Sequence, residues 1–278
     1  MSSQHRSRAQ RFVDLHREGC FLLPNAWDVG SARILESAGF PALATTSAGI
    51  AFSLGRPDHD LDPRGRVDRT TMLRRVAEIA AEVAVPVSAD LEDGYGQAPE
   101  LVAATVSAAI EAGAAGGNFE DFTGDGSQPL HDPALAVDRI SAARAAVDAG
   151  GEPFVLVGRT DVLLVDGSLD ECVRRANAYL AAGADCAFVP GAADSATIKT
   201  LVAELDGPLN VVMGLTSSSL TFADLRALGV RRVTVGASIA RAMYRHLLRA
   251  ADELATHGTF TYAADQVPQS DLNTLFSR

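Results

Sequence analysis

Residues 111–121 read EAGAAGGNFED, and this stretch carries the pattern from which we derive the fold. Its first glycine, Gly113, comes where a helical segment ends, and a left-handed glycine commonly terminates a helix. An apolar run begins a few residues later, as expected where a short loop leads from a helix into a strand. The same order recurs in ESAGFPALATT (36–46), AAGADCAFVP (181–190) and ALGVRRVTVG (227–236). The repetition predicts a chain built from helix and strand units.

Outward from these stretches, short apolar or β-branched runs alternate with longer alanine-rich segments of helical period. Strands are expected at residues 20–23, 42–45, 85–89, 116–119, 154–157, 186–189, 209–213 and 232–235. Helices are expected after them at 29–37, 71–83, 99–112, 133–149, 169–181, 196–205, 221–228 and 238–256. Eight such pairs predict an α/β fold, the (β/α)₈ TIM barrel. A doubly wound open sheet is the alternative, and it is disfavoured because no GxGxxG follows the first strand.

The length of 278 residues suits one domain over residues 1–278, with the barrel at about 19–257. A further helix is expected before the barrel, over roughly residues 4–17. The tail, residues 258–278, contains apolar side chains that have no evident place in a barrel: Tyr262, Leu272, Leu275 and Phe276. We expect this tail either to pack on a neighbouring subunit or to fold over its own barrel.

Composition excludes several classes of function. The net charge of −11, from 24 basic and 35 acidic residues, disfavours a nucleic-acid partner because the surface repels phosphate groups. No apolar run approaches the roughly 18 residues that cross a bilayer, and the first residues lack a secretory signal, so we expect a cytoplasmic protein without a membrane partner. The three cysteines are widely spaced, which predicts neither disulfides nor structural zinc. The single lysine, Lys199, argues against Schiff-base chemistry and a P-loop.

Acidic residues follow several of the predicted strands. Asp90 and Glu92 follow the third strand, and two residues of extended chain would place them on one face, roughly 7 Å apart. Glu120 ends the fourth strand, and Asp58 lies in the long connection after the second. Carboxylates that converge on one rim repel each other unless a cation compensates them. We therefore expect Mg²⁺, or Mn²⁺ in its place, with one direct carboxylate and others reaching it through water. The alternative is that these acids cap helices or bind arginines.

Groups that bind an anion are expected on the same rim. Arg159 ends the fifth strand, and a guanidinium can hold a carboxylate or phosphonate with two hydrogen bonds. Thr46 and Ser47 follow the second strand, where hydroxyls and small residues allow close approach of an anion. Ser47 could instead be only a turn residue. Together these groups predict a pocket for a small, doubly anionic substrate.

Five segments in this order resemble the isocitrate lyase/phosphoenolpyruvate mutase superfamily, up to about residue 248. They are TTSAGIAFSLGRPD (45–58), PVSADLEDGYG (86–96), GAAGGNFED (113–121), GRTD (158–161) and AGADCAFVPG (182–191). The resemblance implies a (β/α)₈ barrel, often a tetramer in which paired subunits exchange their last helices. It also implies Mg²⁺ and a 2-oxo acid or its enolate as substrate, with a C–C or P–C bond made or broken beside the oxo group.

The resemblance also assigns residues. Asp90 and Glu92 match the two carboxylates of the family's metal motif, and Asp58 and Glu120 match its outer carboxylates. Arg159 matches the substrate-binding arginine. The family's anion-holding loop falls on the three residues Thr46, Ser47 and Ala48.

The sequence departs from the family in two places. The loop after the fourth strand, DFTGDGSQPLHDP (121–133), contains neither the lysine nor the cysteine of the family's KxCG motif. Pro190 stands near the position at which phosphonate-handling members have a histidine. We therefore expect a divergent branch that acts by decarboxylation or retro-aldol cleavage, with His131 or Asp125 as a loop acid or base. A solvated loop histidine without a catalytic role is the alternative for His131.

Three functions follow from these observations. The first is a Mg²⁺-dependent lyase or mutase-like enzyme that acts on a small 2-oxo acid, with Arg159, Ser47 and His131 as catalytic candidates and a dimer or tetramer as its assembly. The second is a catalytically silent binder of 2-oxo dicarboxylate metabolites. The third is an unrelated phosphate-binding barrel that uses the glycine-rich end of the last strand, residues 236–238.

Overall fold

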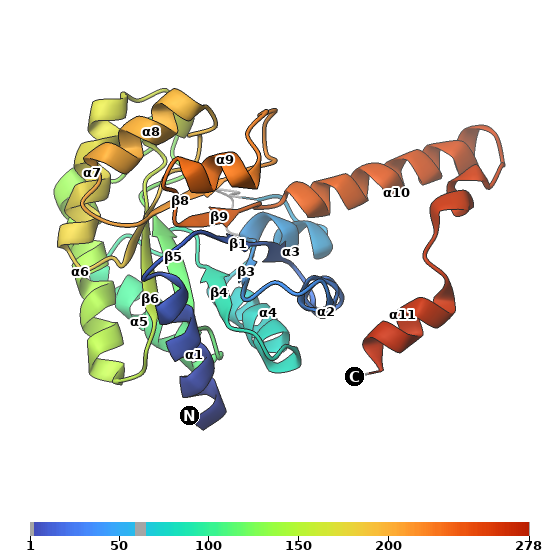
Figure 1. Cartoon of the computed structure of the whole chain (residues 1–278), viewed down its shortest axis with the longest axis horizontal. Helices are drawn as coiled ribbons and strands as arrows, with labels where there is room; N and C mark the ends of the chain where they lie inside the picture. The colour runs from blue at the N-terminus through green and yellow to red at the C-terminus, as the bar shows by residue number, and fades with distance from the viewer. Residues whose placement is uncertain (1–2, 59–64, 278) are drawn as a thin grey trace.

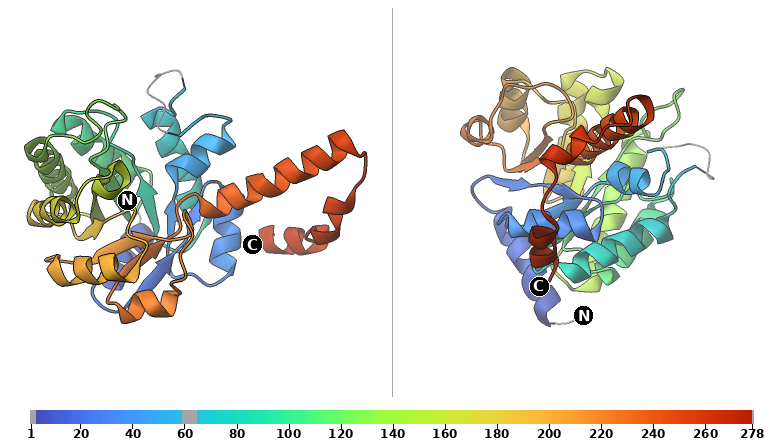
Figure 2. Two further views of the ribbon diagram at one scale, coloured as in Figure 1. Left: turned by 90° about the horizontal axis from the view of Figure 1, so that it is seen from above. Right: turned by 90° about the vertical axis from the view of Figure 1, so that its right-hand side faces the viewer.

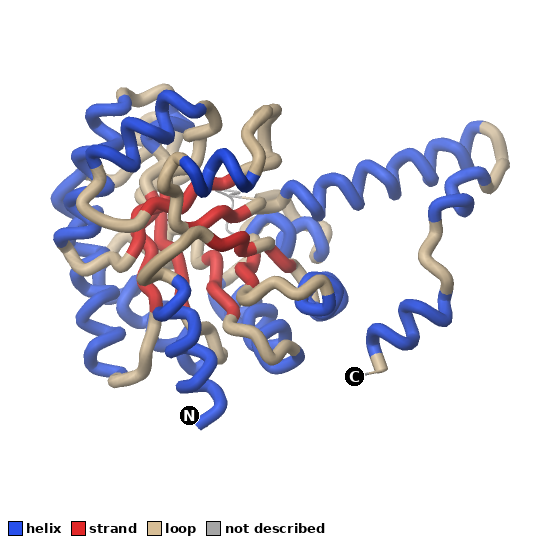
Figure 3. The backbone as a smooth tube through the Cα atoms, in the orientation of Figure 1, coloured by secondary structure: helices blue, strands red, loops and turns tan. Residues whose placement is uncertain are grey.

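Nine parallel strands surrounded by helices make up the body of the molecule (Figures 1 and 3), as described by a computed structural model for residues 3–58 and 65–277. The strands follow the order β1-β9-β8-β7-β6-β5-β4-β3-β2. They are β1 (Phe21–Leu23), β2 (Asn25–Ala26), β3 (Leu43–Thr45), β4 (Val87–Asp90), β5 (Gly116–Glu120), β6 (Val155–Arg159), β7 (Cys186–Phe188), β8 (Leu209–Val212) and β9 (Arg232–Thr234).

The sheet closes on itself through Pro24. β1 pairs with β9 and β2 pairs with β3, so the two ends of the strand order are separated by this one residue. Proline has no N–H to donate to the ladder, so β1 ends before it, and β2, which lies beyond the strand predicted at 20–23, begins after it. Its carbonyl oxygen still accepts a hydrogen bond from the Ala44 N–H, 2.9 Å away. The predicted (β/α)₈ barrel is therefore confirmed.

The eight barrel helices that the sequence predicts are present close to their expected bounds. They are α2 (Val29–Ser37), α4 (Arg69–Glu82), α5 (Pro99–Glu111), α6 (Pro133–Gly150), α7 (Leu169–Ala181), α8 (Ser195–Glu204), α9 (Phe222–Ala227) and α10 (Ser238–Thr256). The glycines of the four repeated stretches, at positions 39, 113, 183 and 229, all have positive φ, as the C-cap interpretation requires. None of the described helices is both long and apolar enough to span a bilayer.

Helix α1 (Ser3–Leu15) covers the amino-terminal end of the barrel, as Figure 1 shows. Phe12 of this helix is completely buried in the cluster of apolar side chains that fills the interior. Its ring packs edge-on against Phe21, where β1 starts, and contacts the position of Gly116, where β5 starts. Helix α1 thus closes the end of the barrel opposite to the carboxyl ends of the strands.

The last part of the chain forms an arm that leaves the barrel (Figures 1 and 2). Helix α10 projects outward, and η2 (Thr261–Asp265) and α11 (Gln269–Phe276) turn back, so that Arg33 of α2 donates to the Phe276 carbonyl at 3.0 Å. One carboxylate holds the turn, because Glu253 accepts hydrogen bonds from the hydroxyls of Thr259 and Thr261 and from two backbone N–H groups. Large apolar side chains along the arm are exposed: Met243, Leu247, Leu248, Leu254, Phe260 and Val267.

Candidate active site at the carboxyl ends of the strands

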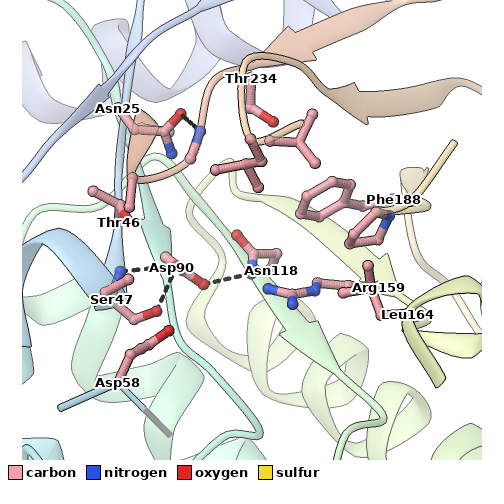
Figure 4. Close-up of a pocket in the computed structure, with 18 of the residues that line it drawn as sticks. Asn25, Thr46, Ser47, Asp58, Asp90, Asn118, Arg159, Leu164, Phe188 and Thr234 are labelled. Carbon is pink, nitrogen blue, oxygen red and sulfur yellow. Dashed lines mark hydrogen bonds between the residues drawn. The ribbon is translucent and has the colours of Figure 1, made fainter. Parts of the chain in front are cut away.

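A cavity of about 380 Å³ opens at the carboxyl ends of the strands, the end at which barrels of this type carry their active sites (Figure 4). Its volume is that of an ordinary small-molecule site. Residues from most strands and several loops line it: Asn25, Ala44, Thr46, Ser47, Ala48, Phe52, Asp58, Asp90, Asn118, Arg159, Leu164, Phe188, Pro190, Gly191, Ala193, Val212, Leu215, Thr216, Arg232, Thr234, Gly236, Ala237 and Arg241.

Asp90, the last residue of β4, is the carboxylate at the centre of this site. Ser47 donates to its Oδ2 from both the backbone N–H and the hydroxyl, at 2.8 Å each. Asn118 of β5 donates to Oδ1, also at 2.8 Å. Burial by itself would raise the pKa of Asp90, but the charge of Arg159 and these hydrogen bonds lower it below its ordinary value. Asp90 is therefore an ionised carboxylate at neutral pH.

Helix α3 (Ser47–Ser53), which the sequence did not predict, brings Ser47 to this carboxylate. Thr46 caps the helix, since its hydroxyl accepts a hydrogen bond from the Gly49 N–H at 3.3 Å. The predicted anion-holding loop is thus the first turn of a short helix, and all three of its residues, Thr46, Ser47 and Ala48, line the cavity. Asp58 lines it as well, and its side chain points toward Ser47 and Asp90 (Figure 4).

Arg159, the last residue of β6, forms part of the cavity wall and is tightly paired. Its Nε and Nη2 donate to the two oxygens of Asp161 at 2.6 and 2.8 Å, and its Nη1 is 2.5 Å from Oε2 of Glu120. Burial lowers the pKa of Arg159, but the charges of Asp161 and Glu120 raise it overall above its ordinary value. The guanidinium therefore stays charged and fixed, with its carbon 5.4 Å from the Phe188 ring centroid.

A buried network behind the strands positions Asp161. Asp121 accepts hydrogen bonds from the Asp161 N–H at 2.9 Å, from the Thr160 hydroxyl at 2.8 Å and from the Tyr179 hydroxyl at 2.6 Å. Because Asp161 holds Arg159, this network sets the position of the cavity arginine. Tyr179 was not predicted, since one tyrosine in a helix carries no signal of such a role.

Two predicted carboxylates, Glu92 and Glu120, do not line the cavity. The expectation that Asp90 and Glu92 share one face of an extended segment is wrong, because β4 ends at Asp90 and Glu92 has a left-handed φ of 49°. Its carboxylate turns away and binds Arg66, 3.1 Å from Nε, and the Tyr95 hydroxyl at 2.9 Å. Glu120 pairs with Arg159, and its burial raises its pKa well above the ordinary value despite that charge. For these two residues the alternative of arginine binding describes the contacts better.

His131 also lies away from the cavity. Its backbone N–H donates to the Asp121 carbonyl at 2.8 Å, its carbonyl accepts from Arg175 at 2.9 Å, and its side chain is only 3% exposed. It is therefore neither in contact with the cavity nor a solvated loop histidine, and burial lowers its pKa. Asp125 is exposed and accepts hydrogen bonds from Ser127 within the loop. Neither position supports the predicted loop acid or base.

The residues present suit one particular kind of metal binding. In the part of the chain that the structure describes, no three histidine, cysteine, aspartate or glutamate side chains are grouped as a metal cage. Mg²⁺ does not need one, because it usually keeps several waters and takes one or two carboxylates. Asp90 is ionised and retains lone-pair capacity beyond its three hydrogen bonds, and Asp58 lies on the same side of the cavity. The donors therefore fit a hydrated Mg²⁺ with Asp90 as its direct protein ligand.

Other cavity residues were not predicted. Asn118 could have been found, because it precedes Glu120 by two residues and so shares its face of β5. Asn25 accepts hydrogen bonds from the N–H groups of Val235 and Gly236, at 2.9 Å each. The Gly236 N–H is therefore already paired with Asn25, although the predicted phosphate site at residues 236–238 would need it as a donor to phosphate.

Comparison with known proteins agrees with this architecture. The model of the phosphoenolpyruvate phosphomutase family matches residues 12–255. A solved structure from Burkholderia cenocepacia J2315, designated a lyase/mutase, is similar with a TM-score of 0.94 and 44% identity, covering 100% of this chain and 98% of that one.

Two characterised relatives extend the comparison. The 2-methylisocitrate lyase of Escherichia coli K12 is 30% identical, over 88% of this chain and 83% of its own. The oxaloacetate decarboxylase of Rhodopseudomonas palustris BisB18 is also 30% identical, over 100% of this chain and 91% of its own. The match covers most of the barrel, and the resemblance inferred from the five segments is confirmed. The chain therefore belongs to the phosphoenolpyruvate phosphomutase family, within the isocitrate lyase/phosphoenolpyruvate mutase superfamily, and is an enzyme of the lyase and mutase type.

Proposed function

We propose that the protein is a Mg²⁺-dependent enzyme that breaks or makes a C–C or P–C bond next to the oxo group of a small 2-oxo acid. One observation carries this proposal. A single cavity contains an ionised Asp90, held by Ser47 and Asn118, together with the fixed guanidinium of Arg159. This combination provides one position for a divalent cation and another for an anionic group of the substrate.

The proposed roles follow from the contacts. Asp90 would hold Mg²⁺ directly, and Asp58 would hold its waters from the same side of the cavity. Glu92 and Glu120, the other predicted metal-site carboxylates, do not line the cavity, and they bind Arg66 and Arg159 instead. When bound, Mg²⁺ would stabilise the negative charge that develops on the oxo oxygen.

The substrate carboxylate would bind to Arg159 and to the turn formed by Thr46, Ser47 and Ala48. The other wall of the cavity is apolar and includes Leu164, Phe188 and Pro190. An apolar wall excludes water, which strengthens the charge interactions of the polar side. It also leaves no histidine at the position of Pro190 for phosphonate chemistry.

Decarboxylation of a 2-oxo dicarboxylate suits these residues best. The bond between C3 and its carboxylate breaks, CO₂ leaves, the electron pair passes to the oxo group, and C3 then takes a proton from water. The bond-breaking step needs no protein base. Among the described residues that line the cavity, the ionisable side chains are aspartates and arginines only, namely Asp58, Asp90, Arg159, Arg232 and Arg241.

The proposal is tested by measuring product formation from oxaloacetate and related 2-oxo acids with Mg²⁺ present. Asp90→Asn should lower turnover by at least about 100-fold, because it removes the charge that binds the metal. The same variant should lose the rise in melting temperature that Mg²⁺ gives the native protein. Asp206→Asn, an exposed substitution far from the cavity, serves as the matched control. Equal Mg²⁺-dependent turnover in Asp90→Asn and native protein would contradict the metal assignment.

A second candidate function is the catalytically silent binder of 2-oxo dicarboxylates. The absence of histidine, lysine, cysteine and tyrosine from the described lining residues favours it. The two functions differ in one measurement, because the binder would show calorimetric binding of 2-oxo acids without a product from any of them.

A further inference from the structure

Arg232, the first residue of β9, is a buried arginine inside the barrel. Its side chain is 1% exposed, and its Nη2 donates to the Ser88 hydroxyl of β4 at 3.4 Å. Its guanidinium carbon lies 5.9 Å from the ring centroid of Phe12, the side chain through which α1 closes the amino-terminal end. Arg232 nevertheless lines the same cavity as Asp90 and Arg159. It therefore forms the floor of the cavity, below the strand ends.

The hydrogen-bonding capacity of Arg232 is largely unused. Over residues 3–58 and 65–277, its Nε and Nη1 have no hydrogen-bond partner, and no carboxylate forms an ion pair with it. The other buried arginines are different: Arg139 donates to three carbonyls, and Arg175 binds Asp121, Glu171 and the His131 carbonyl. A buried guanidinium without an acceptor is strongly unfavourable. Such a group is expected where a ligand supplies the acceptor.

The charge of Arg232 persists in this environment. Burial lowers its pKa, but only to about 10, so the guanidinium is protonated at neutral pH. Two other polar residues that line the cavity, Asn25 and Thr234, have partners. Asn25 donates to the Thr45 carbonyl at 2.7 Å and accepts from two N–H groups of the chain, and Thr234 donates to the Val211 carbonyl at 3.3 Å. Arg232 is thus a charged residue at the floor of the cavity whose Nε and Nη1 donors are available to a ligand.

We propose that Arg232 binds a carboxylate of the substrate at the floor of the cavity and thereby selects a 2-oxo dicarboxylate over a 2-oxo monocarboxylate. This inference rests on the proposed function, and it adds a second anion-binding position to the one at the rim. The rim position has the Ser47 turn and Arg159, the last residue of β6, whereas Arg232 begins its strand and contacts α1. A ligand with a single carboxylate can use one of these positions, and a dicarboxylate can use both.

The test compares two probes by calorimetry with Mg²⁺ present: the dicarboxylate 3,3-difluorooxaloacetate and the monocarboxylate pyruvate. Arg232→Met should weaken binding of the dicarboxylate by about 10- to 100-fold, because it removes charge-assisted hydrogen bonds, and should change pyruvate binding about twofold at most. Arg232→Lys keeps the charge and should lose less. Arg231→Met, the adjacent residue whose side chain bonds the Gly19 carbonyl outside the cavity, should leave both affinities unchanged.

Thermal melting without ligand separates binding from a structural role. Arg232→Met should melt at the same temperature as the native protein or higher, because it removes an unpaired buried charge. A lower melting temperature, together with an unchanged preference for the dicarboxylate in Arg232→Met, would overturn the inference and leave the proposed function standing. If the native protein binds neither probe, the proposed function fails. The anion-binding role of Arg232 is then tested separately, with malonate in the absence of Mg²⁺. A malonate-induced rise in melting temperature that is lost in Arg232→Met would support the anion position, and the same rise in both proteins would overturn it.

Discussion

Asp90 remains charged in a buried site because neighbouring groups replace the water that burial removes. Three hydrogen bonds from Ser47 and Asn118 reach its two oxygens, and Arg159 contributes a positive charge. The two donor residues come from different elements, so the carboxylate also ties α3 and β5 to β4. The residue that we propose as the metal ligand therefore also stabilises the barrel.

This dual role predicts a pH dependence of stability. The folded-state pKa of Asp90 lies below its ordinary value of 3.8, so its stabilising effect is complete above pH 3.8 and is lost as the pH falls through the folded-state pKa. Asp90→Asn should therefore lower the free energy of unfolding by about 1.5–3 kcal/mol at pH 7. That difference should be constant from neutral pH to about pH 5 and should shrink below pH 4.

The measurement is urea denaturation of native and variant protein across this pH range. Asp206→Asn provides the control, because Asp206 is exposed in the loop between α8 and β8 and does not line the cavity. A difference that grows as the pH falls would show that the sign of the Asp90 shift is wrong.

At the scale of the elements, β5 depends on two glycines for its close packing. A Cβ at Gly116 would meet the Val155 carbonyl and the Phe12 ring, each at 2.7 Å, and a Cβ at Gly117 would meet Leu91 at 2.8 Å. The strand therefore approaches both its neighbour β6 and the helix α1 more closely than any other residue type would allow. This approach lets α1 close the barrel beneath the cavity.

Gly116→Ala should destabilise the protein by about 1–3 kcal/mol, because the obstacle on one side is backbone that cannot rotate away. Gly126→Ala is the matched control, since nothing lies within 4 Å of the added methyl group, and it should change stability by about 0.5 kcal/mol or less. Equal midpoints of urea unfolding for the two variants would contradict this account of the packing.

Strands and long helices were predictable because burial imposes a regular pattern on them. The strands are buried on both faces, which gives uninterrupted apolar runs, and the glycines of the repeats mark where helices end. Helix α3 was not predictable, because seven residues of mostly small side chains are too short to show a helical period. The 3₁₀ turn η1 (Val162–Val165), which places Leu164 on the cavity wall, was not predicted either, because four residues are too short to show a period.

The candidate site was predictable only in part. The strand ends indicated Asp90 and Arg159, because their position follows from topology alone. The direction of Glu92 depends on one φ angle after the strand, and the pairing of Glu120 depends on the length of the Arg159 side chain. Arg232 lies at the start of a strand, where the topological rule gives no reason to seek a ligand-binding residue. The contacts of these residues thus depend on local backbone conformation and on the reach of long side chains, which the order of residues along the chain does not reveal.

At the scale of the whole molecule, the exposed arm predicts self-association. Met243, Leu247 and Leu248 of α10 are 58%, 60% and 63% exposed, an apolar group that a single chain leaves in contact with water. The contact of α11 with α2 shows part of the tail against its own barrel, while α10 extends away from it. We propose that a second copy covers the apolar side chains of α10, in a dimer or tetramer.

Changing Leu247 and Leu248 together to Glu should weaken this association by about 100-fold or more, because two buried leucines each contribute about 1.5–3 kcal/mol. Light scattering after size-exclusion chromatography measures the molar mass of the native protein and the variant over a range of concentrations. Leu101→Glu, which changes an exposed leucine on α5, is the control and should keep the native mass. A native protein that is monomeric at every concentration would contradict the prediction.

The carboxylate of Glu253 has a consequence for how such an assembly forms. It accepts four hydrogen bonds from Thr259, Thr261 and Tyr262, so the bend that follows α10 is fixed within one chain. A preorganised arm gives up little conformational entropy when it docks, and more of its contact energy is then available as affinity. Glu253 should therefore govern the strength of assembly from a position that need not touch the other copy at all.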